Sequence, residues 1–252
     1  MKNAPNLPDP IATAEKLLAK AGIKIPPVDL NQITSIWSNL FVVEEELDGT
    51  GYLLPIGELG AEILINRDDR GERKRFTLAH ELGHWVLGLS FKKKVGHFMQ
   101  PKNVHHVEIE RWCDTFATNI LMPRFMIQAN VPQIDPVLAI NMIVNAASQF
   151  KVSEEAFFIR LWETLRFQVA YVASKGSSGE SGYELQRSFA GHGEGLALES
   201  LLNQREVIEL LEKSLFPVFS ATTQTGKIKC AGRKLSANRL ILVLKWPAET
   251  DA

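Results

Sequence analysis

The first 66 residues change from a helical to a strand-like spacing of apolar positions. Apolar residues recur with the helical period over residues 10–21, and Gly22 ends that pattern. A shorter second helix is predicted to begin after Asp29, a residue type that caps helix N-termini well. Apolar and polar residues then alternate with a period of two, which indicates short strands separated by glycine-rich turns. These strands cover residues 40–43, 52–54 and 61–65.

Helical spacing dominates the next hundred residues. Gly88 is expected to end the first of these helices, and Ser153 to cap the start of the last one. The four predicted helices cover residues 72–87, 104–121, 136–149 and 154–165.

After Arg166 the period returns to two, with a helix predicted at 196–215 between strands. We therefore predict an α+β fold with a boundary near Arg166. A domain with a small sheet and a helical second half would cover residues 1–165, and a small α+β module residues 166–252. The predicted strands of this module cover residues 167–172, 183–189, 218–222, 227–230 and 239–244.

Composition excludes several classes of protein. The 252-residue chain is 45% apolar and 23% charged with a formal net charge of −1, so it is neither disordered nor drawn to nucleic acid or an anionic membrane. Its basic runs at 73–75 and 92–94 are short and are expected to be solvated surface. The two cysteines cannot form a disulfide framework. Neither a signal peptide nor 18 consecutive apolar residues occur, which predicts a cytoplasmic protein without a membrane span.

The segment with most chemical content is His80-Glu81-Leu82-Gly83-His84. On a helix, His80 and His84 lie one turn apart on one face, so both imidazoles can bind one metal ion. Glu81 lies about 100° around the helix from His80, outside the ligand shell but within reach of a water molecule on the metal. It is the candidate general base. The alternative is a helix whose two histidines merely share a face, but the surrounding apolar residues disfavour it.

A catalytic zinc needs a third protein ligand. A third histidine six residues after His84 is excluded, because Ser90 occupies that position. Within the predicted helix 104–121, Glu110 and Asp114 lie one turn apart at the margin of an apolar stripe. We assign Glu110 as the third ligand and Asp114 as the acceptor of the outer N–H of a ligand histidine, most simply His80. The other candidates are His97, His105, His106, Glu108 and Cys113, of which Glu108 is the next best carboxylate.

These motifs together resemble the ImmA/IrrE family of zinc metallopeptidases. The resemblance rests on RFTLAHELGH at residues 75–84, ERWCDTFA at 110–117 and ILMP at 120–123, and it extends over about residues 8–165. The family pattern Glu-x-x-Ala-Asn/Asp-x-Phe-Ala places the third ligand on Glu110. This chain has Cys113 where the pattern has alanine, and we expect that side chain to pack in the core.

The resemblance implies a zincin-like metallopeptidase domain with one catalytic zinc. It also implies a protein substrate, a helix-turn-helix transcriptional repressor whose cleavage derepresses stress or mobile-element genes. The position of residues 166–252 is similar to that of a GAF-like sensor domain, and a substrate exosite is the other interpretation. The alternative function is a non-catalytic, antitoxin-like regulatory protein with a structural or vestigial metal site.

Three further expectations concern substrate and partners. A peptidase holds extended substrate against an exposed sheet edge, and we predict that residues 61–66, with Ile63, Leu64, Ile65 and Asn66, provide it. The helix pair at 136–165 is similar to a helix-turn-helix, but its second helix begins with acidic residues, which favours packing over DNA binding. Candidates for stabilising an oxyanion are His97, His105, His106, Tyr52 and His192.

Overall fold

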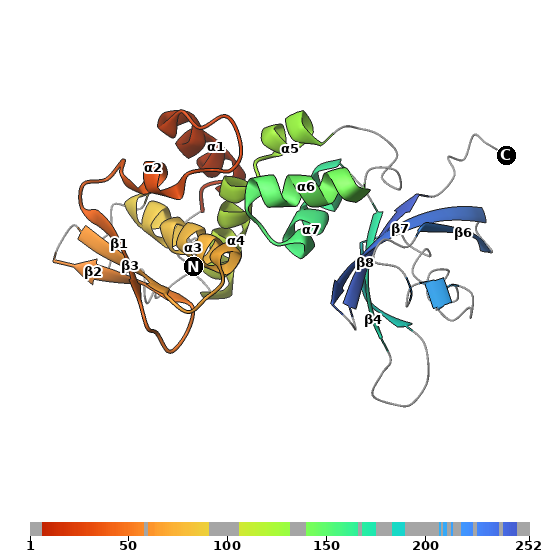
Figure 1. Ribbon diagram of the computed structural model, residues 1–252. Coiled ribbons are helices and arrows are strands. Elements are labelled where there is room, and N and C mark those ends of the chain that lie inside the picture. The colour runs from red at the N-terminus through yellow and green to blue at the C-terminus, as the bar shows by residue number, and fades with distance from the viewer. Residues whose placement is uncertain are drawn as a thin grey trace, which may run out of the picture. The chain divides into compact units, whose positions relative to one another are not determined.

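The computed structural model places the chain in two compact units (Figure 1). Unit 1 consists of residues 1–126 and 149–152, and unit 2 of residues 127–148 and 153–252. The residues that the structure describes are 7–57, 60–90, 106–131, 140–165, 168–174, 183–189, 207, 209, 210, 213, 218–223, 226–236 and 239–245.

The two N-terminal helices begin where the sequence predicts. Helix α1 (Pro10–Ala21) is capped by Asp9, whose carboxylate accepts the N–H of Ile11 at 2.8 Å, and Gly22 ends it with φ of 72°. Helix α2 (Leu30–Thr34) is capped by Asp29, which accepts the N–H of Asn31 at 2.9 Å. Local side-chain capping therefore fixes the start of both helices.

Unit 1 contains a three-stranded sheet with the order β1-β3-β2. Strand β3 (Gly60–Asn66) pairs in parallel with β1 (Leu40–Glu45) and antiparallel with β2 (Gly51–Ile56). The prediction that residues 61–66 form an exposed edge is therefore wrong. The backbone groups of β3, including those of Ile63, Leu64, Ile65 and Asn66, already face a neighbouring strand on either side, and the free edges belong to β1 and β2.

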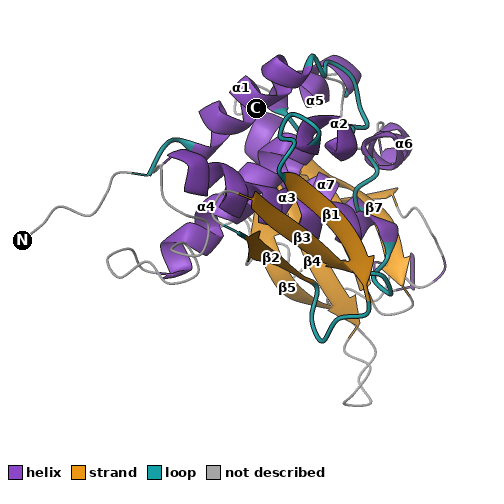
Figure 2. Cartoon of the chain, turned by 90° about the vertical axis from the view of Figure 1, so that its left-hand side faces the viewer, coloured by secondary structure: helices purple, strands orange, loops and turns teal. Residues whose placement is uncertain are grey.

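Helix α3 (Gly71–Ser90) covers one face of this sheet (Figures 1 and 2). Leu53, Ala61 and Ile63 are buried, whereas Tyr52 and other apolar residues on the opposite face remain exposed. The expected stop at Gly88 is wrong, because α3 continues to Ser90 and Gly88 is buried within it. Tertiary packing there outweighs the helix penalty of about 1 kcal/mol for glycine.

Helix α4 (His106–Leu121) buries the predicted apolar stripe. Trp112 stacks on Phe116 with ring centroids 5.3 Å apart, and the Trp112 indole N–H donates to the carbonyl oxygen of Pro8 at 2.6 Å. Both α3 and α1 pack against this helix. The face of α4 that carries Glu110 and Asp114 is thereby held against α3.

Unit 2 contains the helix pair α6 (Ile140–Phe150, shared with unit 1 at its end) and α7 (Glu154–Leu165) and a five-stranded antiparallel sheet. The predicted domains with a boundary near Arg166 stay a prediction. Within unit 2, α7 packs against β4 (Gln168–Ser174), and its Glu154 forms an ion pair with Arg233 of β7 (Gly226–Ser236) at 2.9 Å. As predicted, the Ser153 hydroxyl caps α7 by accepting the N–H of Ala156 at 3.1 Å. The strands of this sheet lie in the order β5 (Tyr183–Phe189), β4 (Gln168–Ser174), β8 (Arg239–Lys245), β7 (Gly226–Ser236) and β6 (Val218–Thr223).

Two remaining elements complete the description. Helix α5 (Arg124–Asn130) follows Pro123, and the predicted helix 196–215 lies largely outside the described residues. None of the described helices combines the length and apolar character that a membrane crossing requires.

Gly51→Ala tests how closely the sheet and α3 pack. An added Cβ would lie 2.4 Å from Thr77 Cγ2 and 2.8 Å from the Leu64 carbonyl oxygen, so the strand or helix must shift. We expect a loss of about 1–3 kcal/mol in the free energy of unfolding, measured by urea denaturation. Gly71→Ala is the control, because its Cβ meets no atom within 4 Å. Equal stability of the two variants would contradict this packing.

Candidate metal centre

The crossing of α3 and α4 brings the candidate side chains together. Gly83 lies at this crossing, where an added Cβ would be 3.3 Å from the Cβ of Cys113 and 3.2 Å from a ring carbon of Phe116. Glycine therefore allows the two helices to approach closely. His80 and His84 extend from α3 on either side of Gly83, one helical turn apart.

Glu110 of α4 faces both imidazoles. Its Oε2 lies 3.1 Å from Nε2 of His80, and its Oε1 lies 3.5 Å from Nε2 of His84. The two imidazole rings are 5.0 Å apart between centroids. Each carboxylate oxygen therefore lies near one ring nitrogen, so donor atoms of three residues converge. Glu108, the alternative carboxylate, is exposed elsewhere on α4.

Asp114 contacts the second ring nitrogen of His80. Its Oδ1 lies 2.9 Å from His80 Nδ1, on the opposite side of the ring from Glu110. When Nδ1–H donates to this carboxylate, the Nε2 atom of neutral His80 carries a free lone pair. The structure thus places Asp114 against the histidine for which the sequence predicts it.

The donor set fits a divalent cation such as zinc. Ligand atoms around a tetrahedral zinc with bonds of about 2.0–2.2 Å lie about 3.3–3.6 Å apart. The distances between the Glu110 oxygens and the two Nε2 atoms, 3.1 and 3.5 Å, are close to this spacing. Two imidazoles and a carboxylate are also a donor set that zinc prefers.

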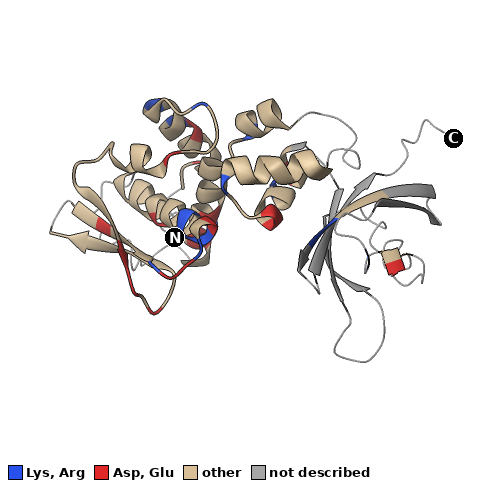
Figure 3. Cartoon of the chain, viewed as in Figure 1, with Lys and Arg blue, Asp and Glu red and all other residues tan. Residues whose placement is uncertain are grey.

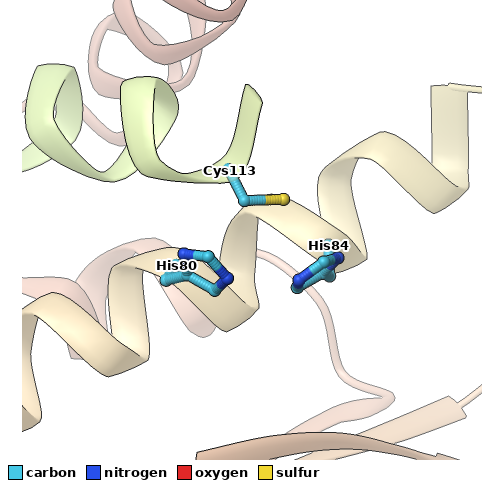
Figure 4. Close-up of side chains that lie close together, drawn as sticks. All are labelled: His80, His84 and Cys113. Carbon is cyan, nitrogen blue, oxygen red and sulfur yellow. The ribbon is translucent and has the colours of Figure 1, made fainter. Parts of the chain in front are cut away.

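Cys113 also approaches the two histidines, although the sequence favours a packing role for it over metal binding. It is fully buried on α4, and its Sγ and a ring nitrogen of each of His80 and His84 all lie within 4.8 Å of one another. Figure 4 shows the sulfur projecting from α4 toward the space between the two imidazoles. The signal in the sequence is its position three residues after Glu110, on the same face of the helix.

Glu81 lies beside the cluster and at the edge of the sheet. The backbone N–H of Leu53, on β2, donates a hydrogen bond to its carboxylate. Burial raises the pKa of Glu81 to about 7, and the negative charge of Glu110 adds to this, whereas His80 and the Leu53 N–H act in the opposite direction. A carboxylate with this pKa can both accept and donate a proton near neutral pH.

Burial also favours the neutral forms of His84 and Cys113. It lowers the pKa of His84, with the nearby His80 acting in the same direction, so His84 is unprotonated at neutral pH. Burial likewise raises the pKa of the Cys113 thiol, and the carboxylates around it add to the effect. A neutral imidazole is the form that binds a metal.

The structure describes two of the candidates for stabilising an oxyanion, Tyr52 and His106. The Tyr52 hydroxyl donates to the carbonyl oxygen of Asp48 at 2.5 Å, and its ring lies on the sheet face away from α3. His106 is exposed at the start of α4, with its Nε2 3.6 Å from Glu110 Oε1. His97, His105 and His192 lie outside the described residues.

The basic run at 73–75 lies at the surface of unit 1, with Arg73 exposed as predicted and Lys74 and Arg75 partly buried. Arg73 pairs with Asp69 at 3.3 Å, Lys74 with Glu44 at 2.5 Å, and Arg75 donates to the Val28 carbonyl oxygen at 2.9 Å. Acidic and basic segments of unit 1 are accordingly interspersed in Figure 3. The run at 92–94 lies outside the described residues.

Comparison with known proteins concerns both the family and the fold. Residues 42–161 match the family model of the IrrE N-terminal-like domain, Peptidase_M78. No curated protein matches the chain. A solved Mycobacterium tuberculosis transcriptional regulator is similar over 94% of this chain and 74% of its own, with a TM-score of 0.57 and 14% identity, which is a likeness of fold alone. Residues 42–161 are thereby identified as an IrrE N-terminal-like domain, which confirms the predicted ImmA/IrrE resemblance over that part of the chain.

Proposed function

We propose that this chain is a zinc-dependent endopeptidase in which His80, His84 and Glu110 hold the metal. The observation that carries this proposal is the convergence of two imidazole Nε2 atoms on the two oxygens of one carboxylate, at 3.1 and 3.5 Å. A bound zinc ion supplies Lewis acidity, which polarises a peptide carbonyl and makes water a stronger nucleophile. The membership of residues 42–161 in a peptidase family supports the same reaction.

Glu81 is the general base in this proposal. Its carboxylate takes a proton from the attacking water and later gives it to the leaving amine nitrogen, so that the peptide C–N bond breaks and two neutral termini can form. The Leu53 N–H holds the carboxylate at the side of the cluster. Its pKa of about 7 suits both proton transfers near neutral pH.

Asp114 positions the histidine rather than reacting. Its contact with His80 Nδ1 at 2.9 Å keeps Nε2 available and fixes the ring orientation. Carboxylates in this position commonly strengthen metal binding by histidine.

The substrate strand is proposed to pair with β2 in place of the central β3. Asn66 N–H donates to the Thr50 carbonyl oxygen at 2.9 Å, so in antiparallel register the even-numbered residues of β2 face β3. The odd-numbered Leu53 then faces the free edge, and its N–H already reaches Glu81 there. Substrate along this edge would pass the proposed general base.

The family resemblance suggests which protein is cleaved. We propose an intracellular helix-turn-helix repressor as the substrate, cleaved in the cytoplasm to derepress stress or mobile-element genes. The sheet-containing module of unit 2 is proposed as the sensor or exosite that controls this cleavage. If the metal site is instead vestigial, the chain regulates its partner by binding alone.

Glu81→Gln distinguishes an endopeptidase from a protein that regulates its partner by binding alone. It removes the proton acceptor while keeping the shape of the side chain, so cleavage of the helix-turn-helix repressor encoded by the neighbouring gene should fall at least about 100-fold. Gel electrophoresis of the mixture measures cleavage, and circular dichroism checks folding. Undiminished cleavage would refute the assignment of Glu81 as the general base. Undiminished derepression in cells would favour a non-catalytic protein that acts by binding.

Metal analysis of purified variants tests the ligands. Asp114→Asn should lower the affinity for zinc about 10–100-fold, and Glu110→Ala, which removes a direct ligand, should lower it further. Glu108→Ala is the matched control on the same helix and should bind zinc as the wild type does. Zinc lost from the Glu108 variant and kept by the Glu110 variant would reverse the assignment.

Photo-crosslinking tests the substrate edge. A photoreactive amino acid at Leu54 of β2 should crosslink to the repressor in the Glu81→Gln background. The same group at Phe41 of β1, on the same exposed sheet face but at the other edge strand, should not. Crosslinks from position 41 alone would place the substrate at β1.

A further inference from the structure

The position of Cys113 is unusual for a packing residue. A small apolar side chain would suffice to fill the crossing with Gly83, and the family pattern has alanine there. Here a thiol projects from that position toward two imidazoles (Figure 4). Its Sγ and the ring nitrogens of His80 and His84 are within 4.8 Å of one another.

The crossing itself limits where this sulfur can go. Gly83 approaches so closely that a Cβ built on it would lie 3.3 Å from both Cα and Cβ of Cys113. The side chain is therefore pressed against α3 between the turns that carry the two histidines. Glu110 lies one turn before it on the same face of α4, with its oxygens on the two Nε2 atoms. Glu110 through its oxygens and Cys113 through its sulfur thus both approach the two imidazoles.

We propose that the Cys113 thiolate is a fourth protein ligand of the metal ion that His80, His84 and Glu110 hold. This inference rests on the metal site of the proposed function. On binding, the S–H bond breaks, a sulfur–metal bond forms, and the proton leaves to bulk water, with no change of oxidation state. Thiolate is a soft ligand that zinc accepts readily.

The consequence is a site with a full set of protein ligands. Two nitrogens, one oxygen and one sulfur would give the metal four protein ligands, the number found in structural zinc sites. Access of water then requires one protein ligand to withdraw or the coordination number to rise. Cys113 thereby sets the resting state of the centre, in contrast to a chain with alanine at this position.

The absorption spectrum of the cobalt-substituted protein detects sulfur ligation without any substrate. The full-length wild-type chain, loaded with one equivalent of Co²⁺ under anaerobic conditions, should show visible ligand-field bands and a near-ultraviolet sulfur-to-cobalt charge-transfer band. Cys113→Ala should lose the charge-transfer band and keep ligand-field bands. Cys230→Ala is the matched control, because Cys230 is the other buried free cysteine, and its spectrum should equal that of the wild type.

The outcomes distinguish this inference from the metal site on which it rests. The wild-type spectrum could contain ligand-field bands that depend on His80 but no charge-transfer band. That result would overturn Cys113 ligation and leave the metal site standing. Absence of any cobalt bands in the wild type would overturn both. Cys113→Ser, which keeps the size of the side chain, should give the same spectral loss as Cys113→Ala if the band arises from sulfur. Persistence of the band in a folded Ser variant would also refute the assignment.

Discussion

The close crossing of α3 and α4 at Gly83 is the constraint on which the candidate centre depends. Neither helix alone carries a complete donor set, since α3 provides the imidazoles of His80 and His84 and α4 provides the carboxylates of Glu110 and Asp114. The two imidazoles are largely buried, and a buried polar group is costly unless it has a partner. The contacts of His80 with a carboxylate at both ring nitrogens offset part of that cost. A cation between the imidazoles and Glu110 would offset it further, which is why the arrangement favours metal binding over simple packing.

Burial of the cluster is costly, and it also shifts the pKa values of its side chains. It moves the pKa of Glu81 up and that of His84 down, so the first can exchange protons near pH 7 and the second presents a neutral imidazole. The β2 edge takes part as well, through the Leu53 N–H on Glu81. Helix pair and sheet edge therefore form one site, in which an extended polypeptide and a proton acceptor can meet. A peptidase needs this combination, and the family to which residues 42–161 belong is consistent with it.

Features that depend on local spacing could be predicted from the sequence. The one-turn separation of His80 and His84, the caps at Asp29 and Ser153 and the apolar stripe of α4 are properties of a few neighbouring residues. Features that depend on long-range pairing could not. A period of two predicts β3 as a strand but does not specify its neighbours, so its central place was missed. The grouping of α7 with unit 2 and the approach of Cys113 to the imidazoles likewise depend on contacts with other elements.

Anomalous X-ray scattering at the zinc edge, from crystals of the protein grown with one equivalent of zinc, tests the central claim most directly. The account predicts a single strong peak within bonding distance of His80 Nε2, His84 Nε2 and Glu110. A peak elsewhere, or none at these three side chains while zinc is present at full stoichiometry, would contradict it.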